Sequence, residues 1–161
     1  TQRATALGEM VIAVDINENR LKMGSLFGAD KVIDASDPTN VIEEIMEITQ
    51  GNGADVSLEA TSSPIARRHS IQCLRTWGKA CFVGEGGDVT LEVSSDLLRK
   101  QITLMGSWTF SISGQMACTQ FIADRKIAVD QIFTDTWELS QAEEAYKLFD
   151  QQKSGKGVFL M

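Results

Sequence analysis

The chain has 161 residues, of which 43% are hydrophobic and 23% charged, and its formal net charge is −7. This length suits one domain of ordinary size with a real core, and the acidic balance argues against a nucleic-acid surface. No apolar run reaches the length of a membrane span, and Thr1–Leu7 lacks the apolar block of a secretory signal.

Apolar runs and amphipathic stretches alternate along the chain. Met10–Val14 is a continuous apolar run, typical of a parallel strand buried on both faces. A helix is predicted over Glu18–Phe27, with Gly28 as its stop. Further strands are predicted over Lys31–Ile33, Asp55–Glu59, Lys79–Val83, Gln101–Gly106 and Gly155–Met161, with a short extended piece over Leu91–Val93. Further helices are predicted over Val41–Thr49, Pro64–Leu74, Asp96–Lys100 and Gln115–Asp124, and a last helix follows an N-cap at Ser140.

This alternation predicts an α/β fold with a doubly wound parallel sheet. Two helix starts carry specific signals. Ser63 precedes Pro64 as an N-cap precedes the first helical position, and Ser140 with Glu143 forms a candidate capping box. In the last helix we expect a buried stripe of Ala142, Ala145, Tyr146 and Phe149.

Asp15 ends the first predicted strand. In dinucleotide-binding folds an acid at this kind of position accepts hydrogen bonds from the adenosine ribose hydroxyls and repels a 2′-phosphate. Arg20, five residues later, is placed to reach the same ribose or its adenine. Two alternatives stay open: Asp15 simply caps a strand end, or it binds the adenosine of another cofactor, as in methyltransferases.

Three segments rich in small residues follow predicted strands, and ligands of open α/β sheets bind along that edge. Small residues let backbone groups approach a ligand closely, although ordinary turns use the same residues. The segments are Glu59-Ala60-Thr61-Ser62, Val83-Gly84-Glu85-Gly86-Gly87 and Gly106-Ser107-Trp108-Thr109.

Several segments, in order and spacing, resemble the cofactor-binding domain of the medium-chain (zinc-type) alcohol, polyol and threonine dehydrogenases. They are Val11–Ala29, Gly51–Ser62, Gly78–Gly84, Ile102–Trp108, Ile132–Phe149 and Gly155–Leu160. The resemblance implies a partial dinucleotide-binding domain over residues 1–154. Residues 155–161 would be a return strand that in the family leads to the catalytic domain.

The resemblance also implies site residues and a cofactor, NAD. Asp15 would bind the adenosine ribose with Arg20 beside it, and Ala60 and Thr61 would border the adenosine and ribose side. Val83, Gly84 and Glu85 would pass near the nicotinamide, and backbone groups there and on Ser107, Trp108 and Thr109 would hold its carboxamide. The strand Gln101–Trp108 resembles the edge strand through which family dimers pair. Trp108 is then an interface residue, a cofactor wall or plain core.

Some family features are missing from the chain. The glycine fingerprint G-x-G-x-x-G should precede Thr1, so we expect an N-terminally truncated piece that alone binds NAD weakly or not at all. Three scattered cysteines (Cys73, Cys81 and Cys118) and the lone His69 predict no zinc site and no catalytic residue here. We therefore expect this chain alone to be inactive. The odd cysteine count suits free thiols in the cytoplasm, and His69 is interpreted as a solvated helix residue.

The missing first strand would lie centrally in the order 3-2-1-4-5-6. Two hypotheses fill the slot: Met10–Val14 and Asp55–Glu59 pair directly, or a segment of this or a neighbouring chain inserts, with Gly155–Met161 the best donor. Two functional alternatives to the dehydrogenase fragment are a non-catalytic, self-associating module and an adenosine-cofactor enzyme such as a methyltransferase. The match of the closing helix and strand disfavours the methyltransferase.

Overall fold

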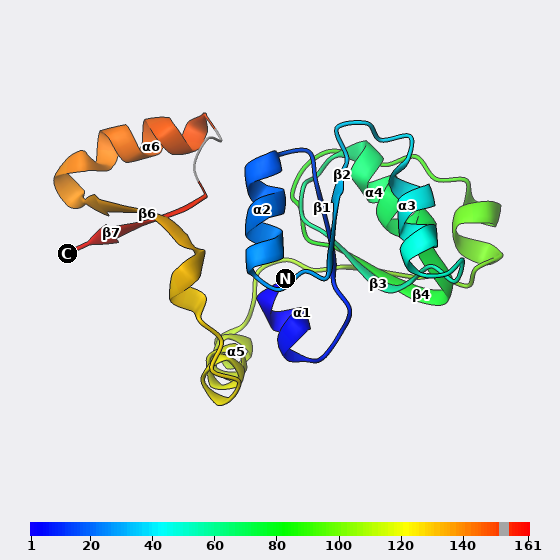
Figure 1. Cartoon of the computed structure of the whole chain (residues 1–161), viewed down its shortest axis with the longest axis horizontal. Coiled ribbons are helices and arrows are strands. Elements are labelled where there is room, and N and C mark those ends of the chain that lie inside the picture. Colours follow the sequence, from blue (N-terminus) through cyan, green and yellow to red (C-terminus); the bar gives the residue numbers. More distant parts are fainter. Residues whose placement is uncertain (152–154) are drawn as a thin grey trace. The chain divides into compact units, whose positions relative to one another are not determined.

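The computed structural model describes residues 1–151 and 155–161, and the chain forms two compact units (Figure 1). Unit 2 comprises Val11–Ser111, and unit 1 comprises Thr1–Met10 with Ile112–Met161. Among the described residues, no helix combines the length and apolar character needed to cross a bilayer.

Unit 2 alternates strands and helices, and every strand pair in it is parallel, which confirms the α/β prediction. Its strands are β1 (Ile12–Asp15), β2 (Lys31–Asp34), β3 (Ala54–Glu59), β4 (Leu74–Phe82) and β5 (Thr103–Gly106). Its helices are α2 (Glu18–Leu26), α3 (Val41–Ile48), α4 (Pro64–Gln72) and a π-helix, η1 (Val93–Leu98). The segment expected as a short helix over 96–100 is therefore a wider turn that starts three residues earlier.

The core of unit 2 forms where the apolar faces of its elements meet. Helix α2 packs on β1 and β2, α4 packs on β3 and β4, and α3 contacts both β2 and α4 (Figure 1). The cluster at the centre joins Ile33 of β2 to the buried side of α3 and to α4 and β4. Its buried members are Ile33, Val41, Ile45, Ile71, Cys73, Leu74 and Ala80.

Local signals set the start of α4 as predicted. The Ser63 hydroxyl accepts from the Ala66 backbone N–H at 3.5 Å, and Pro64 occupies the first turn. The helix ends at Gln72 rather than at Leu74, because β4 begins at Leu74, five residues before the predicted strand.

The strands of unit 2 form two sheets, with orders β1-β2 and β3-β4-β5. In the described part of the chain, β1 does not pair with β3, and β7 (Lys156–Leu160) pairs with β6 (Phe133–Glu138) instead of entering the slot. Direct pairing of the two strands and insertion of the tail of the same chain are therefore wrong, while insertion by a neighbouring chain stays a prediction. Side-chain packing around α3 holds the two sheets together, in place of a hydrogen-bonded ladder between them.

Unit 1 holds α1 (Gln2–Ala6), α5 (Ile112–Asp124), η2 (Val129–Ile132), β6, η3 (Leu139–Gln141), α6 (Ala142–Asp150) and β7. Strand β6 was not anticipated, because in its sequence FTDTWE only Phe133 and Trp137 are apolar, so it has neither an apolar run nor a clear alternation. The predicted domain boundary at residue 154 lies outside the described residues.

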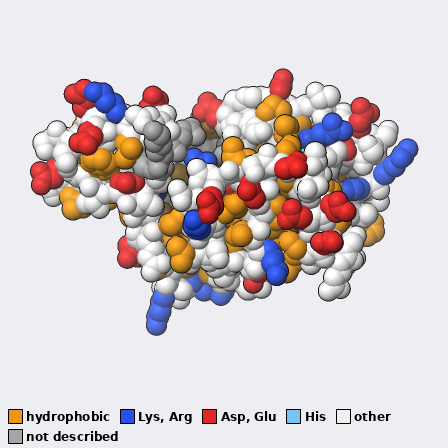
Figure 2. All heavy atoms as spheres, turned by 45° about the horizontal axis from the view of Figure 1, so that its top comes forward, with side chains coloured by type: hydrophobic (Ala, Val, Ile, Leu, Met, Phe, Trp, Pro, Cys, Tyr) orange, Lys and Arg blue, Asp and Glu red, His pale blue; other side chains and the backbone are white. Residues whose placement is uncertain are grey.

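The predicted start and inner face of the last helix need correction. Helix α6 begins at Ala142 after Gln141, and the capping box joins Glu138 to Gln141 in the preceding turn rather than Ser140 to Glu143. Of the expected stripe only Ala145 is buried, while Tyr146 is 68% and Phe149 62% exposed. Figure 2 shows apolar side chains at the surface between the acidic ones. The amphipathic pattern identified the helix correctly, but in this structure it does not bury those two rings.

Candidate functional site

Asp15 lies at the carboxyl end of β1, where the chain turns into α2. Its Oδ1 atom accepts a hydrogen bond from the Asn17 backbone N–H at 2.9 Å and lies 3.8 Å from an Arg20 guanidinium nitrogen. With no other described residue does the carboxylate form a hydrogen bond or ion pair, so Oδ2 is free to accept from a ligand. The side chain keeps 22% of its surface exposed, which suits a group that meets a ligand from solvent.

The turn after β3 is organised by a buried carboxylate, Glu59, which is 4% exposed. Its Oε1 atom accepts from the Thr61 N–H, the Thr61 hydroxyl at 2.6 Å and the Ser62 N–H at 2.9 Å. Burial raises the pKa of Glu59, but these hydrogen bonds and the charge of Arg67 outweigh it, so the pKa lies below its usual value. Glu59 is therefore an anion that fixes this turn.

The loop after β4 packs against the same turn. Val83 and Gly84 donate their N–H groups to the Glu59 carbonyl at 2.8 and 3.2 Å, and the Ser62 hydroxyl donates to the Glu85 carbonyl. A Cβ atom at Gly84 would lie 2.6 Å from the Ser62 nitrogen, and one at Gly87 would lie 2.5 Å from the Ser62 oxygen. Glycine at these two positions is thus what lets the two loops touch.

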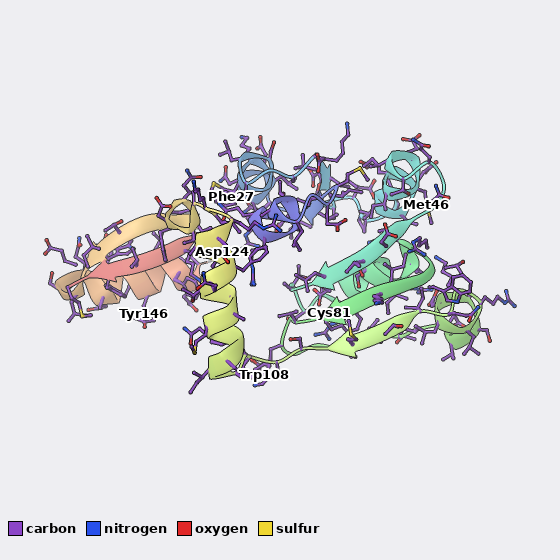
Figure 3. All side chains as sticks on the ribbon, turned by 90° about the horizontal axis from the view of Figure 1, so that it is seen from below. Phe27, Met46, Cys81, Trp108, Asp124 and Tyr146 are labelled. Atoms are coloured by element: carbon purple, nitrogen blue, oxygen red, sulfur yellow. The ribbon has the colours of Figure 1, made fainter. Side chains whose placement is uncertain are left out.

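The third segment leaves β5, and Figure 3 marks Trp108 where the chain has left that strand. Ser107 donates its N–H to the Phe82 carbonyl at 2.9 Å, so the segment begins beside the end of β4. Trp108 is 65% exposed, which rules out plain core in this structure, and Thr109 has a left-handed backbone with φ of 49°.

The predicted residues thus fall into two groups. Thr61, Val83, Gly84, Glu85 and Ser107 come together at the carboxyl ends of β3, β4 and β5, as expected, with Ala60 exposed beside Thr61. Asp15 ends β1 of the other sheet and Arg20 lies on the following helix α2, and in the part of the chain that is described no hydrogen bond or ion pair joins them to those loops.

Sequence reasoning missed Arg67, which is 7% exposed and binds both loops. The usable signal is an acid at a strand end followed eight residues later by an arginine on the next helix, but that spacing is common and does not by itself reveal burial.

His69 is half-buried rather than fully solvated, and burial, followed by the charge of Arg68, lowers its pKa. Within the described ranges, no three or more His, Cys, Asp or Glu side chains are grouped so that they could hold a metal ion.

The sequence matches the model of a family described as zinc-binding dehydrogenase over residues 1–124. It is 32% identical over 148 residues to the uncharacterized zinc-type alcohol dehydrogenase-like protein YphC of Escherichia coli, covering 92% of this chain and 42% of that protein. It is 29% identical to the L-threonine 3-dehydrogenase of Pyrococcus horikoshii, covering 94% and 44%.

Among solved structures, the chain is similar to an alcohol dehydrogenase of Thermotoga maritima, with a TM-score of 0.83 and 27% identity. That alignment covers 94% of this chain and 43% of the other. The chain therefore spans somewhat less than half the length of the relatives it matches.

Proposed function

From the premise that this chain belongs to the zinc-binding dehydrogenase family, we propose that it is the NAD-binding part of a zinc-type alcohol or polyol dehydrogenase. When bound, NAD accepts a hydride from an alcohol carbon at its nicotinamide ring. The chain's own contribution is to bind and orient that cofactor. In this proposal, the residues that bind the cofactor do not hold the zinc or contact the substrate.

The observation that carries the proposal is the environment of Asp15. A carboxylate oxygen that has no partner among the described residues, at the carboxyl end of a parallel strand, fits the two vicinal hydroxyls of an adenosine ribose. The same negative charge disfavours the 2′-phosphate of NADP, although Arg20 reduces that repulsion. NAD is therefore the expected cofactor.

The loops after β3, β4 and β5 contact the rest of the cofactor in this proposal. Ala60 and Thr61 border the adenosine and ribose side, while Val83, Gly84 and Glu85 and then Ser107, Trp108 and Thr109 approach the nicotinamide. These loops begin side by side, because Glu59 pairs with Phe82, and Phe82 with Gly106, in the sheet register. By itself, this chain is expected to bind NAD weakly and to be inactive.

The test is an Asp15→Asn substitution in the natural protein that contains this sequence. Losing charge-assisted hydrogen bonds should weaken NAD binding by about tenfold or more, while NADP binding falls less. Asp34→Asn is the matched control, because Asp34 pairs with Asp15 across β1 and β2 and accepts from the Ser36 N–H as Asp15 accepts from Asn17. Equal loss in both variants, or no loss in Asp15→Asn measured by calorimetry, would contradict the assignment.

We also propose a homodimer that pairs through residues 101–108. Strand β5 is the edge of its sheet, and Leu104, Met105 and Trp108 on or beside it are 41%, 45% and 65% exposed. An unpaired apolar edge favours a further strand, and a lysine there blocks pairing. Leu104→Lys should therefore convert a dimer to a monomer in sedimentation, whereas a wild-type monomer would exclude this proposal.

The cytoplasm is the proposed compartment, because all three cysteines are free.

A further inference from the structure

Arg67 lies on α4, but its side chain donates hydrogen bonds to the loop that follows β4. Its Nη2 atom donates to the carbonyls of Gly84, at 2.8 Å, and of Gly86. The guanidinium also lies over the Phe82 ring, 5.6 Å from its centroid. Planar guanidinium groups favour several acceptors at once and stack well on aromatic faces.

On its other side Arg67 faces the carboxylate that organises the turn after β3. The Arg67 Nε and Glu59 Oε2 atoms are 3.5 Å apart, both side chains are more than nine-tenths buried, and neither of these two atoms has a hydrogen bond to a described residue. A buried charge without a partner is expensive, so each residue is needed to compensate the other. The Glu59–Arg67 pair is thus held by charge while both residues use other atoms to bind backbone.

Among the described residues, three further hydrogen bonds join the two loops directly. Backbone N–H groups of Val83 and Gly84 reach the Glu59 carbonyl, and the Ser62 hydroxyl reaches the Glu85 carbonyl. Among the residues that the structure describes, Arg67 is the one cation that contacts both the Glu59 carboxylate and the loop carbonyls, so it links the charge beneath one loop to the backbone of the other.

We propose that Arg67 is a positioning residue that fixes the turn at residues 59–62 and the loop at residues 83–87 relative to each other. The inference rests on the proposed function, because these two loops are the ones assigned to the ribose and nicotinamide of NAD. Arg67 itself acts through the loop backbone and is not assigned a contact with the cofactor. Removing the Arg67 side chain should leave every residue that contacts the cofactor present, but it should make the two loops more mobile relative to each other.

The experiment compares Arg67→Met with Arg68→Met in the natural protein. Arg68 is the exposed neighbour on the same helix, so its variant controls for loss of charge and for the change in helix sequence. Amide hydrogen exchange of residues 59–62 and 83–87 is measured without cofactor, and NAD binding is measured by calorimetry. Loss of two charge-assisted hydrogen bonds predicts about tenfold weaker NAD binding and faster exchange in both segments for Arg67→Met alone.

Arg67→Lys separates positioning from general stability. A lysine keeps the charge facing Glu59 but cannot copy the planar donor arrangement toward two carbonyls. We expect residues 59–62 to regain slow exchange in Arg67→Lys while residues 83–87 remain fast, and NAD affinity to be restored only in part. If Arg67→Met fails to fold, this variant still provides the test.

Three results would overturn the inference: unchanged exchange in both segments, faster exchange everywhere in the protein, or faster exchange in both segments with wild-type NAD affinity. A wild-type protein that binds no NAD would instead disprove the proposed function. In that case the exchange measurement still decides whether Arg67 joins the loops.

Discussion

Unit 2 and unit 1 contain the same kinds of elements but bury them very differently. Among the described residues, Ala145 is the only buried apolar residue of unit 1, whereas Leu21 and the core cluster around Ile71 and Leu74 are all in unit 2. In unit 1 even the paired rings Tyr146 and Phe159, stacked at 6.3 Å, leave Tyr146 largely exposed.

The difference shows that element type and packing are specified separately. Helix α6 is as clearly amphipathic as α3 in sequence, yet only α3 finds neighbours that cover its apolar face. Because apolar burial supplies most of the free energy of folding, unit 2 should hold most of the stability that this chain generates by itself.

The largest expected effect tests the core of unit 2. Ile71→Ala removes a side chain with 0% exposure and should reduce the free energy of unfolding by about 2–5 kcal/mol. Urea denaturation measures the change, and Ile65→Ala on the same helix, where Ile65 is 53% exposed, is the control.

The difference between the two units also predicts that Tyr146→Ala in unit 1 lowers the free energy of unfolding by at most about 1.5 kcal/mol. Equal costs for Ile71 and Tyr146 would show that the two units are not different in this respect.

A smaller effect compares two cysteines without changing the sequence. Burial raises the pKa of the Cys73 thiol in unit 2 to about 11, although the charge of Lys100 acts in the opposite direction. The thiol should stay protonated at pH 8.5 and alkylate far more slowly than Cys118 of unit 1, which is only half-buried. Mass spectrometry of timed iodoacetamide reactions measures both rates, and equal rates would contradict a stable core around Cys73.

The same shift has a consequence for stability. Since the folded pKa of Cys73 lies above the value of about 8.5 for an unfolded chain, the unfolded state releases its proton first as the pH rises. Its contribution to stability is complete below that pH and is lost progressively above it. Alkaline conditions should therefore speed Cys73 labelling by promoting unfolding as well as ionisation.

Most of the fold of unit 2 could be predicted, because its strands are short apolar runs and its helices carry end signals such as Ser63 and Pro64. The early start of β4 could not, since Trp77, with φ of 61°, and Gly78 resemble a turn in sequence. Strand β6 lacked an apolar run, and nothing in the pattern of α6 indicated that Tyr146 and Phe149 would remain exposed.

The site was predicted at the level of loops and not of the contacts that fix them. Strand ends and small residues indicated Thr61, Gly84 and Ser107, because parallel strands end at one edge. The Glu59–Arg67 pair depends on how α4 turns over that edge, which is a property of packing. Local sequence patterns do not encode it.

The separation of the two sheets in unit 2 has a mechanical consequence. Hydrogen-bonded ladders resist shear because each bond is directional, whereas apolar packing resists pulling apart but is largely indifferent to small sliding. Asp15 ends a strand of one sheet, and the loop at residues 83–87 follows a strand of the other. The contact between the two sheets is made by apolar side chains, among them Ile33, Val41 and Ile45. A rigid ligand long enough to contact both sheets would therefore restrain their sliding relative to each other and make unit 2 mechanically stiffer.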